Sequence, residues 1–297
     1  MGFEKAQGAA SNMNAAEYVL TGGLAVAGVD KSAIVSDDEC VSYGELAVRV
    51  ARLAAALREA GMHPGDRVAI LMLDHADLVA LYLAIIAAGG IAITVSTRTT
   101  GDDLRHIFTI VRPFAVVAES EFAQTAAIGM ASDTRLFLRQ RELKSWMQRS
   151  ETELVPCAHK PHDPAYWVMT SGTTGQPKVV DHRHNNVCAR TDYLVHGLAA
   201  TATDRFLPTS RLNFAYALGA MFGALRLGAT LILHERWPTP ASIAATVERN
   251  RPSIVFSVPT LFHKLCGSEF ASSFSFRAVR CYVSAGERLP PQIGLEW

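Results

Sequence analysis

Short apolar segments alternate with helical patterns along most of the chain, and this alternation strongly limits its fold. The segments Arg67–Leu73, Ile91–Val95 and Thr230–Leu233 are nearly continuous apolar runs. Between such runs, apolar residues recur at helical spacing, as in 46–57 after the capping-box pair Ser42 and Glu45. Strands that are apolar on both faces are typical of parallel sheets with helices on both sides. The sequence therefore predicts an α/β fold of parallel sheets covered by helices.

The segment from Leu78 to Val95 has no charged residue and is long enough to suggest a membrane helix. Gly89 and Gly90 divide it, so we expect a buried helix followed by a buried strand. Residues 1–14 contain no long apolar stretch, and we expect no signal peptide there.

The overall composition excludes several partners. Lys plus Arg and Asp plus Glu both number 28 in 297 residues, so the net charge is zero. Because the chain has no excess of positive charge, we expect neither nucleic acid nor a membrane surface as a partner. Five scattered cysteines without a C-x-x-C pair are typical of reduced thiols in a cytoplasmic protein. The polar segment Arg141–Asp163 is interpreted as a linker.

A loop of small polar residues follows the apolar segment Ala165–Met169. Its sequence is Thr170-Ser171-Gly172-Thr173-Thr174-Gly175-Gln176-Pro177-Lys178-Val179. Glycines let backbone N–H groups approach anionic oxygens, hydroxyls donate hydrogen bonds, and Lys178 adds positive charge. The spacing differs from the phosphate loop G-x-x-x-x-G-K-[ST]. From composition alone, a phosphate site and an ordinary polar surface loop both remain open.

The run from Thr170 to His184 closely resembles the signature loop of the adenylate-forming (AMP-binding) enzymes, such as acyl-CoA synthetases, peptide-synthetase adenylation domains and luciferases. Four other segments resemble the family's motifs in the same order: Ser42–Leu46, Gly65–Val68, Pro259–Leu261 and Ser284–Glu287. Asn213–Gly219 and Arg236–Pro240 resemble segments of the benzoate and hydroxybenzoate CoA ligases. The resemblance extends from about Asn14 to Trp297.

This resemblance implies an incomplete large N-terminal domain of the adenylate-forming fold over 1–297. It implies one subdomain from about 15–73 with 205–297 and another from about 74–204. It also implies an ATP-dependent carboxylic acid–CoA ligase for benzoate or a related aromatic acid. ATP, Mg²⁺ and coenzyme A are the implied cofactors and co-substrates. In such enzymes a carboxylate attacks the α-phosphorus of ATP, and the thiol of coenzyme A then displaces AMP.

The same resemblance assigns roles to three groups of residues. Lys178 would neutralise phosphate charge together with the loop. Four residues would lie against the adenine, and four would border the acid. The implied ATP-binding residues are Thr170, Ser171, Gly172, Thr173, Thr174, Gly175, Lys178, Ser284, Ala285, Gly286 and Glu287, and the implied acid-binding residues are Phe214, Ala215, Tyr216 and Ala217.

Alternative interpretations remain for several of these residues. Phe214 and Tyr216 also fit as core aromatics, and Glu287 as an ordinary carboxylate at a helix start. His182 and His184 are two residues apart, but no third ligand follows at a suitable spacing. We therefore expect no metal site there, and hydrogen bonding near the loop instead.

Three residues depart from the family pattern. Val179 and Ala217 stand where glycine is usual, and Ala220 stands where the benzoate branch often has asparagine. A β-branched residue at 179 would be strained if the site required a positive φ.

The family's later acidic motif and the lysine that promotes adenylation have no counterpart before Trp297. We expect this chain alone to have little or no ligase activity. A non-catalytic nucleotide- or acid-binding remnant, and a ligase for a fatty or other carboxylic acid, are the alternatives.

Overall fold

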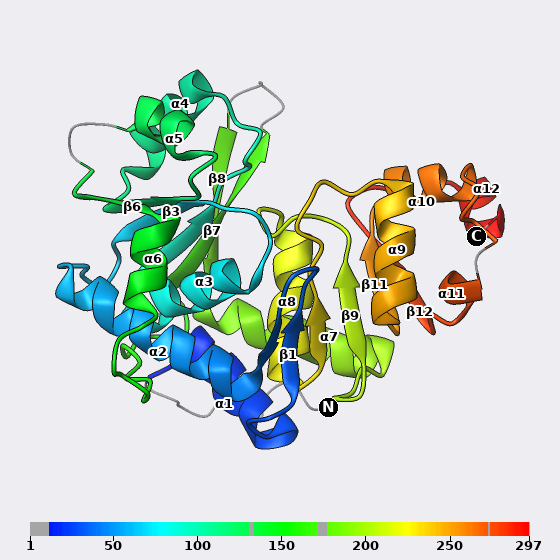
Figure 1. The fold of residues 1–297 in the computed structure, drawn as a ribbon, viewed down its shortest axis with the longest axis horizontal. Helices are drawn as coiled ribbons and strands as arrows, with labels where there is room; N and C mark the ends of the chain where they lie inside the picture. Colours follow the sequence, from blue (N-terminus) through cyan, green and yellow to red (C-terminus); the bar gives the residue numbers. More distant parts are fainter. Residues whose placement is uncertain (1–11, 131–133, 172–176, 273, 297) are drawn as a thin grey trace.

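Two six-stranded sheets form the framework of the chain (Figure 1). The computed structural model describes residues 12–130, 134–171, 177–272 and 274–296. Sheet A has the strand order β12-β11-β9-β10-β1-β2, and sheet B has the order β6-β5-β3-β4-β7-β8. The strands of sheet A are β1 (Ser32–Val35), β2 (Cys40–Ser42), β9 (Arg205–Pro208), β10 (Thr230–Ile232), β11 (Ile254–Ser257) and β12 (Cys281–Ser284). Those of sheet B are β3 (Arg67–Leu71), β4 (Ile91–Thr94), β5 (Ala115–Ala118), β6 (Leu136–Arg139), β7 (Pro164–Ser171) and β8 (Pro177–Arg183).

All strand pairs are parallel except β1 with β2 and β7 with β8. The prediction of parallel sheets covered by helices is therefore confirmed. In both exceptions, the paired strands are consecutive in the sequence. A short connection can join two paired strands only when they are antiparallel.

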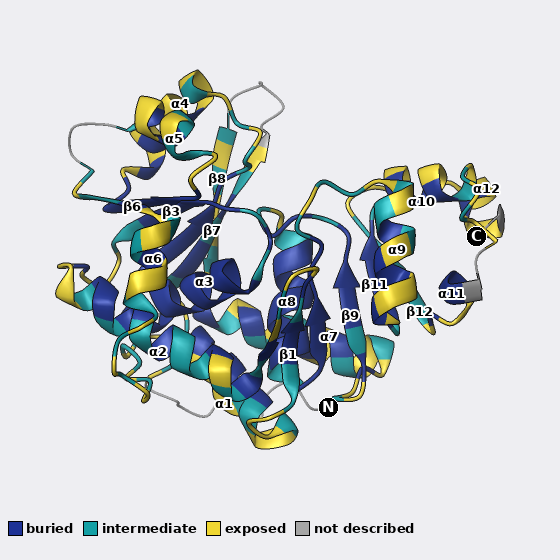
Figure 2. Cartoon of the chain, in the orientation of Figure 1, coloured by how far each residue is buried: buried dark blue, intermediate teal, exposed yellow. Residues whose placement is uncertain are grey.

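Helices cover both sheets. The longer ones are α1 (Ala15–Ala27), α2 (Tyr43–Glu59), α3 (Ala76–Ala88), α4 (Gly101–Val111), α7 (His184–Leu198), α8 (Ala215–Arg226) and α9 (Pro240–Asn250). The shorter ones are α5 (Ala123–Gly129), α6 (Gln140–Trp146), α10 (Pro259–Cys266), α11 (Phe274–Arg277) and α12 (Pro291–Glu296). Every residue of α3 is buried, and α8 is buried over most of its length (Figure 2).

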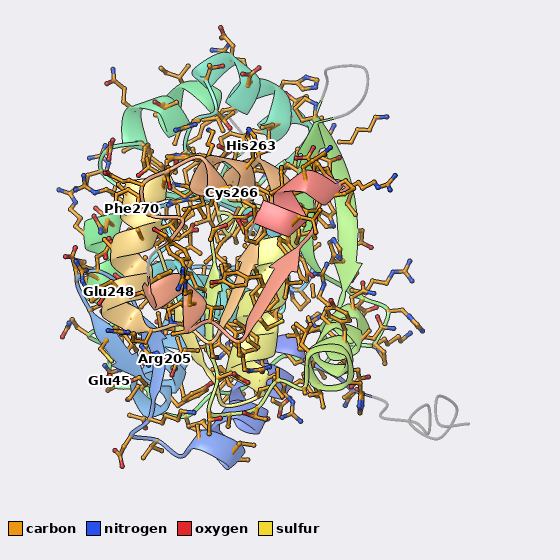
Figure 3. All side chains as sticks on the ribbon, turned by 90° about the vertical axis from the view of Figure 1, so that its right-hand side faces the viewer. Glu45, Arg205, Glu248, His263, Cys266 and Phe270 are labelled. Carbon is orange, nitrogen blue, oxygen red and sulfur yellow. The ribbon has the colours of Figure 1, made fainter. Side chains whose placement is uncertain are left out.

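Alternate residues of each strand point to opposite faces of its sheet and pack in different apolar clusters. In β3, Val68 and Ile70 belong to a large central cluster, while Ala69 and Leu71 pack under α4. In β9, Phe206 belongs to the same central cluster, while Leu207 packs under α9 and α10. One face of each sheet thus meets a single shared core, which also contains residues of α1, α2, α3 and α8. The outer cover of sheet A, with His263 and Cys266 on α10 and Glu248 on α9, faces the viewer in Figure 3.

Three aromatic rings connect the two halves inside this core. Tyr82 of α3, Tyr166 of β7 and Phe222 of α8 have ring centroids 5.3 to 6.0 Å apart in tilted or edge-on pairs. Such pairs add about 0.5–1.5 kcal/mol each beyond the burial of their area. Helix α8, which follows β9 of sheet A, is therefore also anchored to sheet B.

Local signals explain where several elements begin and end. Ser42 Oγ accepts from Glu45 N at 3.2 Å, and Glu45 Oε2 accepts from Ser42 N at 2.8 Å, which completes the predicted capping box of α2. Gly89 ends α3 with a φ of +100°, and β4 follows. The apolar segment 78–95 is therefore a buried helix and a buried strand, as predicted. Across the described ranges, no helix combines the length and the apolarity needed to cross a bilayer.

The predicted linker Arg141–Asp163 is partly wrong, because α6 covers its first residues. The carboxylate of Glu142 accepts from Arg139 N at 3.0 Å, and Leu143 is fully buried. One buried leucine and a local cap thus order a segment whose composition is polar.

Strand β3 lies within 15–73, which we expect to form one subdomain with 205–297. In the structure, β3 pairs with β4 and β5 of sheet B.

A buried carboxylate connects three strands at the amino ends of sheet A. Arg280 donates from Nε and Nη2 to the two oxygens of Asp204, at 2.8 and 2.7 Å. Ser253 Oγ donates to the same carboxylate at 2.6 Å, and Thr201 N does so at 2.8 Å. Although burial acts in the opposite direction, these donors lower the pKa of Asp204 to about 2. The segments that enter β9, β11 and β12 are therefore held by one carboxylate.

Candidate active site

The hairpin of β7 and β8 carries the predicted phosphate loop. Residues 172–176, which include the predicted Gly172, Thr173, Thr174 and Gly175, lie outside the described residues. At the base of the loop, Thr170 and Lys178 face each other in register, and both side chains are exposed. The ammonium group of Lys178 is therefore accessible to an anion.

The predicted adenine-side residues follow directly from the end of β12. Ser284 ends the strand, and Ala285 N donates to Ser257 O at 3.3 Å. The hydroxyl oxygen of Ser284 is buried without a hydrogen-bond partner among the described residues. Thr260 Oγ1 donates to Glu287 Oε1 at 3.0 Å, which connects two segments that resemble family motifs. Glu287 lies in the turn before α12 rather than at the start of a helix.

The turn around Gly286 requires glycine, because its φ is +96°. This turn lies at the carboxyl edge of sheet A, where ligands of open α/β sheets bind. The buried Ser284 hydroxyl is thus an available donor at such an edge.

The predicted acid-binding segment begins α8 and has mixed exposure. Phe214 is 47% exposed, whereas Ala217 is fully buried in the shared core. Tyr216 Oη donates to Val283 O at 2.7 Å, and burial raises the pKa of this hydroxyl above its ordinary value. This bond places the predicted acid-binding segment beside β12, at Val283, the residue before Ser284.

A cavity of about 70 Å³ lies beside Tyr216. It lies between α7, α8 and β11 and is partly open to solvent. Tyr216 meets Phe256 edge-on there, with ring centroids 5.9 Å apart. The other lining residues are Arg190, Tyr193, Leu194, Gly219 and Ala220. Aromatic and aliphatic walls with few polar groups are typical of sites for small organic ligands.

A buried ion pair joins the two sheets near their carboxyl edges. Arg211 Nε lies 3.5 Å from Asp74 Oδ2, and Leu212 N donates to the same oxygen at 3.0 Å. Burial raises the pKa of Asp74 to about 6, while Arg211 and the Leu212 N–H act in the opposite direction. Because Asp74 follows β3 and Arg211 follows β9, this pair holds the start of the predicted acid-binding segment against sheet B.

The histidines after the loop have structural partners. His184 is fully buried, and its Nδ1 accepts from Ala15 N at 3.0 Å. Burial and then the charge of His159 lower the pKa of His184 to about 4. His182 stacks on Tyr166 with ring centroids 4.7 Å apart. Within the described residues, no three His, Cys, Asp or Glu side chains form a group suited to a metal ion.

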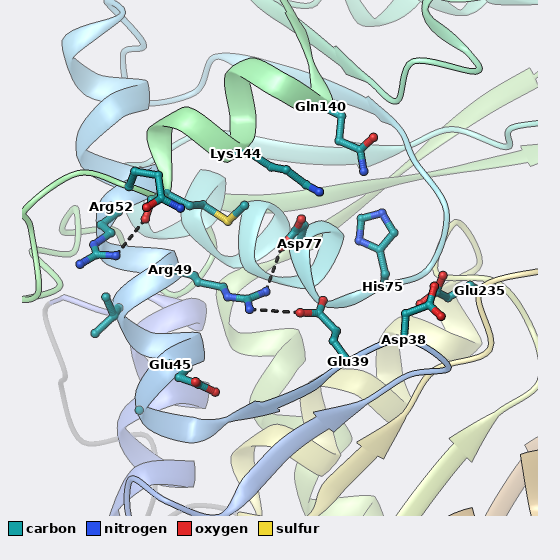
Figure 4. Close-up of a pocket in the computed structure, with 14 residues that line it drawn as sticks. Asp38, Glu39, Glu45, Arg49, Arg52, His75, Asp77, Gln140, Lys144 and Glu235 are labelled. Carbon is teal, nitrogen blue, oxygen red and sulfur yellow. Dashed lines mark hydrogen bonds and ion pairs between the residues drawn. The ribbon is translucent and has the colours of Figure 1, made fainter. Parts of the chain in front are cut away.

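A larger hollow of about 750 Å³ lies away from these segments, between α2, α6 and the β1–β2 turn (Figure 4). None of the site residues predicted from the sequence lines it. Figure 4 shows Arg49 between Glu39 and Asp77, to which it is paired at 3.1 and 2.9 Å. With charges of both signs on its wall, this hollow indicates no particular ligand.

Comparison with known proteins identifies the family. Residues 24–297 match the family described as AMP-binding enzyme. The chain belongs to this family. It is 34% identical over 295 residues to a 3-hydroxybenzoate–CoA ligase of Aromatoleum sp. (strain CIB), and the match covers 96% of the chain and 56% of that protein. It is 31% identical over 298 residues to a 3-hydroxybenzoate–CoA/4-hydroxybenzoate–CoA ligase of Thauera aromatica, covering 96% and 57%.

Solved structures of family members have the same fold. A benzoate CoA ligase from Burkholderia xenovorans LB400 matches with a TM-score of 0.86 and 28% identity, covering 95% of the chain and 58% of that structure. An anthranilate CoA ligase in complex with anthranoyl-AMP matches with a TM-score of 0.92 and 22% identity, covering 99% and 58%. The chain spans about half the length of the curated relatives it matches.

Sequence reasoning did not find Arg190 or Phe256 as candidate site residues. Phe256 is an ordinary member of an apolar strand, and Arg190 is one polar residue on a mixed helix. No local sequence pattern marks either position. Both reach Tyr216 only through the packing of α7 on α8 and β11.

Proposed function

We propose that this chain forms the ATP- and acid-binding part of an ATP-dependent carboxylic acid–CoA ligase. Its acid would be benzoate or a related aromatic acid. The match to hydroxybenzoate–CoA ligases over 96% of the chain carries this proposal. The ring-lined cavity at Tyr216 supports it, since aromatic walls suit an aromatic acid.

In the first half-reaction, the acid's carboxylate oxygen attacks the α-phosphorus of ATP, and pyrophosphate leaves. Two anions approach each other, so neutralising phosphate charge lowers the barrier. The exposed Lys178 and Thr170 would contact the β- and γ-phosphates together with Ser171 to Gly175. In the second half-reaction, the thiol of coenzyme A attacks the acyl carbon, loses its proton, and AMP leaves with the electron pair of the broken bond.

The remaining assignments concern the ligands and their surroundings. Ser284, Ala285, Gly286 and Glu287 would lie against the adenine, with the buried Ser284 hydroxyl available to donate. Mg²⁺ would accompany the phosphates of ATP, but the described residues offer no ligand cluster for it, so we assign it no protein ligands.

We propose a cytoplasmic location for the protein. We also propose two subdomains, one built on about 15–73 with 205–297 and the other on about 74–204.

Exchange of pyrophosphate into ATP tests the proposal directly. The assay uses the protein as its gene encodes it, including any residues that follow Trp297, with benzoate, 3-hydroxybenzoate, 4-hydroxybenzoate and octanoate. We expect exchange with the aromatic acids and a loss of at least about tenfold in Lys178→Met, since one charge-assisted contact is worth about 1.5–3 kcal/mol. Lys264→Met, on the exposed side of α10, is the matched control and should retain exchange.

Two results would contradict the proposal. Turnover of octanoate with inert benzoates would remove the aromatic assignment. Exchange without thioester formation when coenzyme A is added would remove coenzyme A as the acceptor.

A further inference from the structure

One cationic group lies at the cavity beside Tyr216. Arg190 of α7 lines this cavity, and its Nη1 donates to Ala215 O at 3.0 Å. None of the ion pairs among the described residues includes Arg190. A guanidinium has five N–H donors, so this bond and the side-chain hydrogen bond with Tyr166 still leave donors for a further acceptor.

Two glycines of α8 make room for this arrangement. A Cβ atom at Gly219 would overlap Arg190 Nη1, and one at Gly223 would overlap Leu194 Cδ1. Glycine inside a helix costs about 1 kcal/mol relative to alanine. Since Arg190 and Leu194 are four residues apart, as are the two glycines, α7 fits against α8 at two successive turns. The packing of α7 on α8 therefore fixes the position of the Arg190 guanidinium.

The surroundings of Arg190 are rings rather than carboxylates. Burial and then the positive charge of Arg190 lower the pKa of His182. The same charge opposes the effect of burial on the pKa values of Tyr82 and Tyr166, and a side-chain hydrogen bond with Arg190 acts in the same direction on Tyr166. Among the described residues, no carboxylate is paired with this guanidinium, so an oxygen acceptor from a ligand would meet a donor whose charge is not compensated there. Hydrogen bonds that involve a charged group are stronger than neutral ones.

The size of the cavity defines which part of a ligand it receives. At about 70 Å³, it is roughly half the size of the cavity of about 150 Å³ that holds benzene. A whole aromatic acid would not fit inside it, but the end of a ring with its substituent would, with the carboxylate outside. In that orientation, the ring substituent would be the group that meets Arg190.

We propose that Arg190 selects aromatic acids that carry an oxygen substituent on the ring, either a hydroxyl or a second carboxylate. This inference rests on the proposed function, because it takes the cavity at Tyr216 as the acid site. Arg190 acts by donating hydrogen bonds to the substituent, while Tyr216 and Phe256 contact the ring.

Binding of stable acyl-adenylate mimics to the 297-residue chain tests this inference. The probes are acyl-sulfamoyl adenosines made from benzoate, 3-hydroxybenzoate, 4-hydroxybenzoate, isophthalate, terephthalate and octanoate, and affinities are measured by calorimetry. We expect the best oxygenated probe to bind about tenfold more tightly than the benzoyl probe, a difference of about 1.4 kcal/mol. The hydroxyl and carboxylate arms identify which oxygen group Arg190 prefers.

Variants separate selection from a structural role. In Arg190→Met, the preference should fall to about one, because the affinity for the oxygenated probes falls about tenfold more than the affinity for the benzoyl probe. Arg190→Lys keeps the charge and should keep part of the preference. Arg105→Met removes an arginine that is exposed on α4, and it should keep the full preference.

The possible failures are distinguishable. An unchanged preference in Arg190→Met, an equal loss for all aromatic probes, or no preference in the unmodified chain would overturn the inference alone. Tightest binding of the octanoyl probe, or no binding of any aromatic probe, would overturn both the inference and the aromatic assignment. A preference that depends on Arg190 without ATP–pyrophosphate exchange would leave the inference in place and remove the ligase proposal.

Discussion

At the scale of single residues, Val179 shows how a departure from the family pattern is accommodated. It lies in β8 opposite Met169 and packs against the core under α4. Among the described residues, Arg112, Ala199 and Arg251 are the non-glycine residues with positive φ, and each ends a helix. Val179 is therefore unstrained, and its side chain contributes packing that glycine would not provide.

Val179→Gly should consequently destabilise the chain. It removes both packing and the conformational restriction of a β-branched residue, whereas Val180→Gly changes a side chain that is 40% exposed. We expect Val179→Gly to lose about 1 kcal/mol more free energy of unfolding than Val180→Gly in urea denaturation. Equal losses would show that Val179 contributes through β-propensity alone.

His184 should make stability depend on pH. Its pKa of about 4 in the folded chain lies below the value of about 6.5 expected when unfolded, so the unfolded chain takes up a proton first as the pH falls. His184→Asn keeps an acceptor for Ala15 N but does not titrate. Between pH 7 and pH 5, the unmodified chain should lose about 2 kcal/mol relative to this variant in urea denaturation. Parallel pH profiles would contradict the assigned pKa.

At the scale of elements, the carboxylate of Asp204 holds the amino ends of three strands of sheet A. Its folded pKa of about 2 lies below the value of an unfolded Asp, so its contribution is present above about pH 4 and is lost as the pH falls toward 2. The ionised form is therefore the one that stabilises these strand ends.

Asp204→Asn should cost about 1–3 kcal/mol at pH 7, because it removes the charged acceptor that Arg280 and Ser253 share, while the Arg280 side chain, 40% exposed, stays hydrated. Asp37→Asn removes a more exposed ion pair with Arg249, and it should cost less than about 1 kcal/mol. Urea denaturation at pH 7 and pH 3.5 measures both variants. The loss in Asp204→Asn should shrink at the lower pH, and a constant loss would indicate a packing effect instead.

Elements with strong local signals were predictable from the sequence, and those that depend on distant contacts were not. Strands β3, β4 and β5 and helix α3 are apolar enough to be recognised alone. Strands β1 and β2 are short, and α6 is ordered by one buried leucine and a local cap. In the site, the motif residues came from the family resemblance, whereas Arg190 needed the packing of two helices.

At the scale of the whole molecule, the two sheets share one core. Phe222 connects α8 to Tyr82 and Tyr166, which lie in α3 and β7. A change at this point should therefore reach both sheets, and we expect the described part of the chain to unfold as a single cooperative unit.

Phe222→Ala should destabilise both sheets by a similar amount, about 3–5 kcal/mol. Hydrogen exchange in increasing denaturant, followed by mass spectrometry, can compare β3 of sheet B with β11 of sheet A. Phe214→Ala changes a ring in the same region that is 47% exposed, and it should have a smaller effect on both strands. Loss of protection in β11 alone would show that the sheets unfold separately.

Strand β8 also affects how copies of this chain meet each other. It is the last strand of sheet B, so one side of its backbone has no strand partner among the described residues. Lys178, Asp181 and Arg183 are exposed along it. Charged side chains on an edge strand oppose the addition of a strand from a second copy. The strand that presents the candidate phosphate-binding lysine thus also protects the chain against aggregation.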